Sequence, residues 1–101
     1  MWAQMIKTRV KDGSEAELRK LFQQLRDTEQ ADSGLVRTLA MRDQNDPSSL
    51  SLLVVFESEE KARAREEDPR RQEALQRIRG ALGDVLTGPP EFFDCDVLLN
   101  K

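Results

Sequence analysis

The sequence predicts an α+β fold of the split βαβ type, with the order β-α-β-β-α-β and a second helix that is broken near Asp68 and Pro69. Three observations predict this fold. A strand-like alternation near the start is followed by a helical stripe. A second alternating segment leads through a cluster of turn residues into an unbroken apolar run. Two helical segments then precede a last alternating segment.

The length and the charge limit the class of protein. A chain of 101 residues has room for one modest core, so we expect residues 1–101 to form a single domain. Its 38% hydrophobic and 35% charged residues occur in periodic blocks, which is typical of a folded globular chain. The net charge of −3 offers no general positive field to a phosphate backbone, so we expect no nucleic-acid partner.

No membrane segment is expected. The longest apolar run, Leu52 to Phe56, is far shorter than the ~20 residues of a membrane-spanning helix. Residues 1–4 contain no charged segment leading into an apolar one. The single cysteine, Cys95, has no partner for a disulfide within the chain and lies in an apolar alternation, which indicates a reduced, buried thiol. We therefore expect a cytoplasmic protein.

The first predicted unit is a strand followed by a helix. Residues 2–11 alternate as a half-buried strand does, with one face made of Trp2, Gln4, Ile6, Thr8 and Val10 and the other of Ala3, Met5, Lys7 and Arg9. Asp12 and Gly13 end this strand. Ser14 and Glu17 have the spacing of a capping box, and the predicted helix runs to about Gln30, with a buried stripe of Leu18, Leu21, Phe22 and Leu25.

The second predicted unit is a hairpin. Gly34 marks the exit from the helix, and Leu35 to Gln44 alternate as a strand. Residues 45–49 are turn-forming residues that lead into the third strand. In this plan the first and third strands lie in the middle of the sheet. The third strand supports this independently, because Leu52 to Phe56 are apolar without interruption, which is typical of a strand covered on both faces.

The third predicted unit is the broken helix and the last strand. Residues 58–67 form its first half, Asp68 caps the second half and Pro69 takes the first helical position. The second half buries a stripe of Ala74, Leu75, Ile78 and Leu82. Residues 88–90 break the chain, and in the strand over residues 91–99 Phe93, Cys95 and Val97 alternate with Asp94 and Asp96.

The helices cover only one face of such a sheet. We expect the opposite face to hold Ala3, Met5, half of the third strand, and Phe92 or Leu98. Leaving these side chains in water forgoes ~1.5–3 kcal/mol each, whereas association costs ~4–15 kcal/mol. We therefore expect a homodimer in which two sheets stack into a dimeric α/β barrel. The alternative is a monomer whose face is solvated by Lys7, Arg9, Arg37 and Arg42.

Several short motifs resemble one family. They are Val10 to Gly13, Ser33-Gly34, Val55 to Glu60, Asp68-Pro69 and Gln72 to Ala74. Together they resemble the antibiotic biosynthesis monooxygenase (ABM) type of dimeric α/β-barrel protein, over nearly the whole chain. The resemblance implies a ferredoxin-like protomer, a homodimer, and a pocket in each subunit between sheet and helices. Members include cofactor-free oxygenases of polycyclic quinols, haem-degrading enzymes, aldehyde-signal modifiers and proteins without an assigned activity.

The residues argue against the haem-degrading branch. The strand asparagine of that branch falls on Ile6, its helix tryptophan on Arg65 and its iron-ligating histidine on Leu75. The chain has no histidine, which excludes proximal imidazole ligation of haem, a histidine-based catalytic relay and a histidine-bearing zinc site. It has no tyrosine to act as a phenolic acid. We expect no cofactor and no metal.

The candidate pocket-lining residues are Gln4, Ile6, Thr8, Arg65 and Leu75. Arg65 has two interpretations: an inward guanidinium that binds an anionic substrate or a developing enolate, or a solvated arginine in a helix rich in i,i+4 pairs, which we favour. Gln4 and Thr8 either supply hydrogen bonds inside an apolar pocket or bond to neighbouring backbone.

Three further residue types have structural interpretations that we favour over functional ones. Asp94 and Asp96 have a spacing that suits Mg²⁺, but a polar outward face explains them without the further ligands that a metal needs. Trp2 either lines the pocket mouth or packs in the core, and we favour packing. Cys95 has no activating neighbour in the sequence and is interpreted as a core residue.

Two functional hypotheses follow. In the first, the protein is a cofactor-independent monooxygenase that binds and desolvates a small aromatic or quinol-like substrate, which itself reacts with oxygen. In the second, it is a non-catalytic dimeric module that binds a small apolar or aromatic ligand, and the absence of histidine and tyrosine favours this hypothesis. The first rests on the family resemblance alone.

Overall fold

The computed structural model describes all residues, 1–101. The elements follow one another as β1 (Trp2–Arg9), α1 (Glu15–Asp27), β2 (Leu35–Asp43), β3 (Asp46–Phe56), α2 (Glu59–Glu67), α3 (Pro69–Gly83) and β4 (Glu91–Asp96). This order confirms the predicted ferredoxin-like fold, with α2 and α3 as the two halves of the broken helix. None of the three helices has the length and the apolar composition that crossing a membrane requires.

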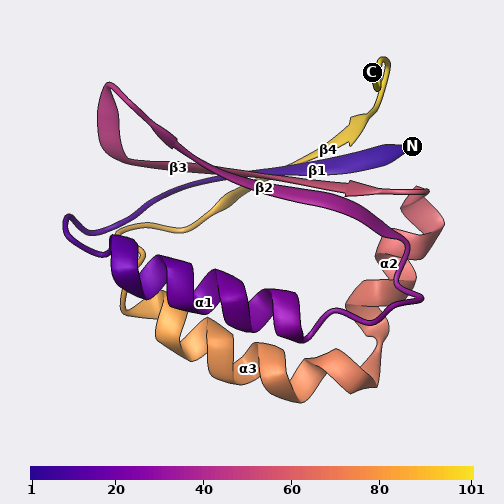
Figure 1. Cartoon of the computed structure of the whole chain (residues 1–101), viewed down its shortest axis with the longest axis horizontal. Coiled ribbons are helices and arrows are strands. Elements are labelled where there is room, and N and C mark those ends of the chain that lie inside the picture. The colour runs from indigo at the N-terminus through magenta and orange to yellow at the C-terminus, as the bar shows by residue number, and fades with distance from the viewer.

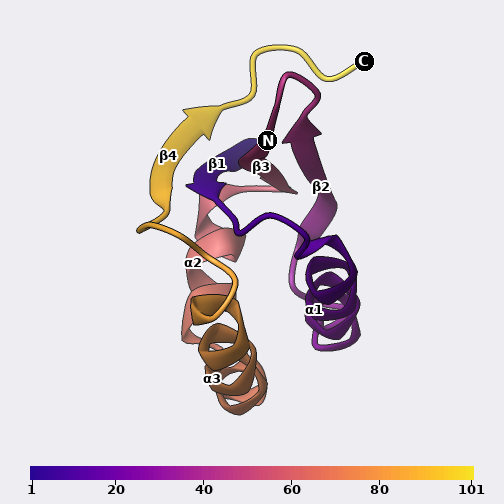
Figure 2. The same ribbon diagram turned by 90° about the vertical axis from the view of Figure 1, so that its left-hand side faces the viewer.

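The four strands form one antiparallel sheet in the order β2-β3-β1-β4. The apolar strand β3 and the first strand are therefore central, as the sequence predicts. Figure 1 shows α1 and α3 on the same side of the sheet, with α2 crossing at one end, and the turned view in Figure 2 shows the opposite side of the sheet free of helices. The sheet is thus covered on one face only.

The hydrophobic core lies between the sheet and the helices, in two parts. The larger part brings together the buried side chains of Val10, Leu18, Leu21, Leu50, Ile78 and Val85. The smaller part, at the α2 end, joins Trp2, Phe56 and Ala62, and the two aromatic ring centroids are 6.0 Å apart. Because the core is divided, the middle of the helix-facing side is left for a cavity.

The helix caps differ in part from the prediction. The predicted capping box is wrong, because the Ser14 hydroxyl donates to the carbonyl of Lys11 at 2.6 Å and does not cap α1. The helix also ends at Asp27, earlier than predicted. The cap at the helix break is confirmed: the Asp68 carboxylate accepts a hydrogen bond from the backbone N–H of Arg70 at 2.9 Å, and Pro69 begins α3.

The hairpin between β2 and β3 is tighter than predicted. Only Gln44 and Asn45 form the turn, and Asp46–Phe56 is continuous strand, so the prediction of a turn over residues 45–49 is wrong. The Arg9 guanidinium donates to the Asp46 carboxylate at 3.0 Å, and the backbone N–H of Val10 donates to the carbonyl of Ser48 at 2.8 Å. These bonds to β1 hold turn-forming residues in an extended conformation.

The side of the sheet away from the helices, which we call the outer face, is largely apolar. Its central row joins Leu39, Leu53, Met5 and Phe93, which lie opposite one another on the four strands. Leu39 and Phe93 are each 42% exposed. The half-buried Cys95 lies beside this row, opposite the buried Ala3.

The prediction that Phe92 or Leu98 belongs to the outer face is wrong. Phe92 pairs with Ile6 and therefore points to the helix side. Leu98 follows the end of β4 and is 95% exposed. Because Phe92 and Phe93 are adjacent, the sequence alone does not show which of them faces the helices. Pairing with β1 places Phe92 on the helix side and Phe93 on the outer face.

Candidate functional site

The candidate site is a cavity of about 680 Å³ between the sheet and helices α1 and α2, which we call the sheet cavity. Nineteen residues line it, and eleven of them are hydrophobic. Its floor comes from β1, β2 and β3, and its roof is formed by one side of α1, by α2 and by Arg71 at the start of α3. The volume and the mainly apolar lining suit a small organic ligand.

Three of the five predicted site residues line the sheet cavity, namely Gln4, Ile6 and Arg65. Thr8 and Leu75 do not. Thr8 is buried beyond the cavity, opposite the core residue Leu50, and its hydroxyl has no hydrogen-bond partner. Leu75 is one turn beyond Arg71 on α3, and its side chain is buried in the helix layer.

Arg65 forms the most enclosed ion pair of the protein. Its guanidinium donates to both carboxylate oxygens of Glu29, with nitrogen–oxygen distances of 2.7–3.1 Å. The two side chains are only 17% and 18% exposed, and the guanidinium also lies 5.2 Å from the centroid of the Phe56 ring. The interpretation of Arg65 as a solvated helix arginine is therefore wrong. Because its partner Glu29 lies beyond the end of α1, 36 positions away in the sequence, no i,i+4 rule identifies the pair.

The environment of Glu29 favours its ionised form. Burial alone would raise the pKa of this carboxyl, but hydrogen bonds from Arg65 and the positive charges of Arg65 and Arg71 outweigh the burial, so the pKa lies below its ordinary value. The carboxylate therefore stays charged at neutral pH and fixes Arg65 in place. Arg65 is consequently not free to bind a ligand with its full fork of donors.

Arg71 is a site residue that the sequence analysis missed. It lines the sheet cavity from the first turn of α3, yet it is only 7% exposed. Its Nε is buried without a hydrogen-bond partner. Burial, with the positive charge of Arg65, lowers the pKa of this guanidinium. The sequence does indicate this burial, because Arg71 precedes the buried Leu75 and Ile78 by four and seven residues and therefore lies on the same helix stripe.

A second charged cluster joins α2 to the edge of the sheet. The Arg63 guanidinium donates to Asp94 at 3.0 Å and to Glu59 at 3.2 Å, and it lies 5.1 Å from the centroid of the Trp2 ring. Gln4 donates to the same Asp94 carboxylate at 3.3 Å. Asp94 thus lies on the helix side of the sheet, yet its side chain is 51% exposed, which agrees with its interpretation as a solvent-facing polar residue. No three acidic, cysteine or histidine side chains gather as a metal site would require.

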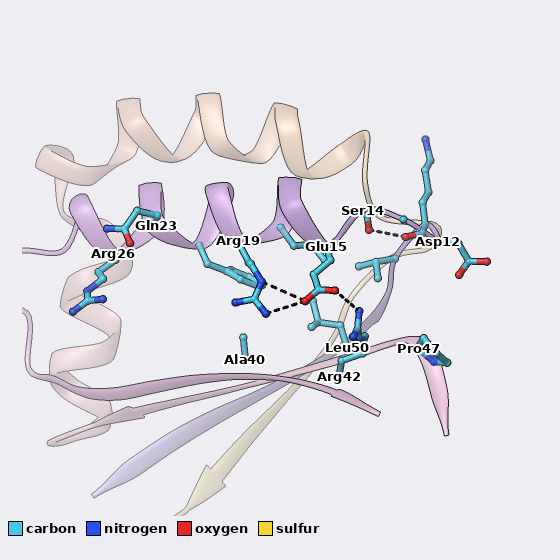
Figure 3. A pocket seen from close by; sticks show the side chains of 15 residues that line it. Asp12, Ser14, Glu15, Arg19, Gln23, Arg26, Ala40, Arg42, Pro47 and Leu50 are labelled. Atoms are coloured by element: carbon cyan, nitrogen blue, oxygen red, sulfur yellow. Dashed lines mark hydrogen bonds and ion pairs between the residues drawn. The ribbon is translucent and has the colours of Figure 1, made fainter. Parts of the chain in front are cut away.

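The protein has another cavity, of about 710 Å³, near the start of α1 and the β2–β3 hairpin. Figure 3 shows Glu15 at its centre, paired with Arg19 and Arg42 at 2.8 and 3.2 Å. Only five of its fifteen lining residues are hydrophobic, and the Glu15 side chain is 50% exposed. Its lining is mainly polar and its Glu15 ion pairs are exposed to water, so we take the more apolar sheet cavity as the candidate functional site.

The sheet cavity combines an apolar body with a cationic end. Side chains such as Trp2, Ile6 and Val54 suit a flat, apolar ligand. The charged lining residues are four arginines and two glutamates, namely Arg26, Arg37, Arg65, Arg71, Glu29 and Glu66. Such an arrangement suits an aromatic molecule that carries negative charge on one of its oxygens. The chain supplies no imidazole for a haem iron.

Comparisons with known proteins agree with this architecture. The family model described as "Antibiotic biosynthesis monooxygenase" matches residues 1–77. Among solved structures, a protein from Caulobacter crescentus described as a putative member of that group has a TM-score of 0.78 at 16% identity, over 97% of this chain and 90% of that one. A similarly described protein from Nitrosomonas europaea has a TM-score of 0.76 at 16% identity, over 98% and 100%.

A third similar structure has a described activity. SnoaB from Streptomyces nogalater, a cofactor-independent oxygenase, has a TM-score of 0.75 at 16% identity, over 98% of this chain and 94% of that one. At these identities the structural similarity shows a shared fold. A comparison with curated proteins by sequence found no match.

Proposed function

The chain belongs to the antibiotic biosynthesis monooxygenase family, and from this premise we propose that it is a cofactor-independent monooxygenase of a small aromatic or quinol-like substrate. The observation that carries the proposal is the sheet cavity of about 680 Å³, with its apolar walls and its cationic end. A similarly folded protein, SnoaB, is a cofactor-independent oxygenase, which makes this chemistry the first to test.

The proposed reaction needs few catalytic side chains. A substrate such as anthrone loses a proton from its CH₂ carbon and becomes an electron-rich anion. Dioxygen takes up electrons from this anion, a C–O bond forms, and protonation gives a hydroperoxide. The O–O bond then breaks with loss of water, which leaves a carbonyl on the former CH₂ carbon. One oxygen atom enters the quinone and the other leaves in water, so dioxygen accepts all four electrons.

The residues of the sheet cavity have binding and electrostatic roles in this proposal. Ile6 and the other apolar side chains exclude water and hold the rings, which strengthens electrostatic interactions with the anion. The Gln4 amide and the Arg65–Glu29 pair lie along the cavity wall, where they orient the oxygen of the substrate. We propose Gln4, Ile6 and Arg65 as site residues on this basis.

Oxygen consumption tests the proposal. Wild-type protein is incubated with anthrone, anthrols and smaller quinols in an oxygen-electrode cell, and quinone formation is followed by absorbance. We expect faster oxygen uptake than in buffer, with one quinone formed per dioxygen. Oxygen uptake at the buffer rate across the whole panel would refute the oxygenase proposal. Binding of the same compounds without uptake would instead favour a non-catalytic ligand-binding module, which the absence of histidine and tyrosine also favours.

We further propose that the protein is a homodimer that buries the outer face. The support is the apolar row Leu39, Leu53, Met5 and Phe93, which no helix covers. Two such sheets packed face to face would form a barrel. Analytical ultracentrifugation at micromolar concentration then gives twice the chain mass of 11.6 kDa.

The dimer proposal has a matched pair of variants. Leu53→Glu places a charge in the middle of the row and should yield the mass of a single chain, whereas Gln24→Glu, on the exposed surface of α1, should not. A single-chain mass for the wild-type protein would contradict the proposal. The free thiol of Cys95 is compatible with the reducing cytoplasm, where we propose that the protein works.

A further inference from the structure

One buried charged side chain of the sheet cavity, Arg71, has no partner in the protein. Arg71 is only 7% exposed, its Nε is buried without a hydrogen bond, and its guanidinium takes part in none of the ion pairs. Buried cations are normally paired, because removing a charge from water is costly unless an opposite charge or hydrogen bonds compensate. The free protein leaves this requirement unmet.

The neighbouring acids are already engaged. Glu29 holds Arg65 through three hydrogen bonds. Asp68 holds the other arginine of this turn, Arg70, with nitrogen–oxygen distances of 2.6–3.0 Å. The charges that act on Arg71 are those of Arg65 and Arg79, which are positive, and of Glu29 and Asp68, which are negative and already paired, so no net negative charge surrounds it. Both burial and the Arg65 charge disfavour the protonated form of Arg71, so an anion placed beside it would be stabilising.

The rest of the cavity defines the body of the ligand. Arg71 shares the lining with apolar and aromatic side chains that include Trp2, Leu52 and Phe56. An inorganic anion would meet Arg71 but leave the apolar walls without contacts, whereas an uncharged hydrocarbon would leave Arg71 unpaired. A planar guanidinium fork binds a carboxylate through two parallel hydrogen bonds.

We propose that the sheet cavity takes an aromatic carboxylate, with its ring system against the apolar walls and its carboxylate on Arg71. Arg71 is then the residue that selects an anionic over a neutral ligand, and the Arg65–Glu29 pair forms the adjacent wall. The inference rests on the proposed function in that it names the substrate class of the same cavity. It concerns binding alone, so it is testable without turnover.

The test compares two probes of nearly equal shape, 2-naphthoate and 2-naphthamide, by isothermal titration calorimetry. We expect wild-type protein to bind the naphthoate about tenfold to a hundredfold more tightly, the range for a hydrogen bond to a charged group. Quenching of Trp2, the single tryptophan of the chain and part of the cavity lining, reports whether the probe enters this cavity. Equal affinity for both probes, or binding of neither, would overturn the inference.

Three variants assign the preference to Arg71. Arg71→Met removes the charge and keeps most of the volume, so the preference for naphthoate should disappear. The melting temperature should not fall, because the guanidinium has no partner to lose. The control is Arg77→Met, an exposed arginine of the same helix, which should keep the preference. Arg71→Lys keeps the charge without the fork and should weaken naphthoate binding about tenfold.

The outcomes separate this inference from the proposed function. A preference for naphthoate that survives Arg71→Met, or that Arg77→Met abolishes equally, would overturn the inference. If Arg71→Met does not fold, the Arg71→Lys variant decides: naphthoate binding as tight as in wild type would overturn the inference. Oxygen uptake with anthrone but equal binding of both probes would overturn the inference and leave the oxygenase proposal intact. A preference for naphthoate that depends on Arg71, without oxygen uptake on any quinol, would support the inference and overturn the oxygenase proposal.

Discussion

Replacing Glu29 by glutamine should destabilise the protein severely, although the change is nearly isosteric. It leaves the Arg65 and Arg71 guanidiniums side by side without the carboxylate that now holds Arg65 at 2.7 Å. Breaking a buried ion pair costs about 3–5 kcal/mol, and breaking an exposed one about 0–1 kcal/mol. Since the two side chains are only 17% and 18% exposed, we place the loss at about 2–4 kcal/mol.

A typical domain has a free energy of unfolding of about 5–15 kcal/mol, so this loss is a large part of the total stability. Urea denaturation followed by circular dichroism measures it as a lower midpoint at unchanged slope. The control is Glu15→Gln, which removes the partner of Arg19 and Arg42 in an ion-pair cluster that is about half exposed. Because water screens exposed pairs, its unfolding midpoint should stay close to that of wild type. A loss for Glu29→Gln that is no greater than the loss for Glu15→Gln would refute the reasoning.

Three further predictions concern pH, the helix break and the tight approach of two segments. The pKa of Glu29 is lower in the folded protein than its ordinary value of 4.5, so its ionised form stabilises the fold at pH values above 4.5. This stabilisation is lost as the pH falls through the lower folded-state pKa. The urea midpoint should therefore depend less on pH in the acid range for Glu29→Gln than for wild type. Asp68→Ala removes the cap of α3 and should cost about 0.5–2 kcal/mol of unfolding free energy in urea, whereas a change near zero would contradict the capping role. Gly34→Ala forces a side chain onto a backbone with φ of +80° and brings its Cβ within 2.5 Å of the Lys61 side chain, so we expect a loss of at least about 1–2 kcal/mol in the same assay, and wild-type stability would argue against strain there.

Much of the fold was predictable because local sequence patterns identify most of its strands and helices. The alternation of residues 2–11, the apolar run from Leu52 to Phe56 and the break at Asp68 and Pro69 each identify an element without reference to any distant residue. Together they gave the right element order and the right central strands. The chain order alone therefore predicted that one face of the sheet would lack helices.

The errors in the fold arise where distant residues override local preference. Turn-forming residues at the start of β3 are held extended by Arg9, which is 37 positions away from Asp46 in the sequence. The Ser14 hydroxyl turns back to the carbonyl of Lys11, so a correct capping spacing gives no cap. In both cases the deciding bond is one that residue spacing cannot reveal.

The candidate site was only partly predictable, for the same reason. The alternation of β1 correctly assigned Gln4 and Ile6 to the helix side, where they line the sheet cavity. The charge of Arg65 was visible in the sequence, but its partner Glu29 is 36 positions away, in the segment that follows α1. Glu67 lies four residues before Arg71, the spacing of an exposed ion pair, yet Arg71 is buried without a partner.

We propose the sheet cavity, and not the cavity beside the hairpin, as the functional site. The most direct test is the oxygen-uptake rate of Val54→Phe, which fills the floor of the sheet cavity, beside that of Gln23→Phe, which narrows only the other one. With anthrone as substrate, we predict that Val54→Phe loses about a hundredfold in rate, as a displaced substrate does, while Gln23→Phe keeps the wild-type rate. A folded Val54→Phe with full activity, or an inactive Gln23→Phe, would contradict the claim.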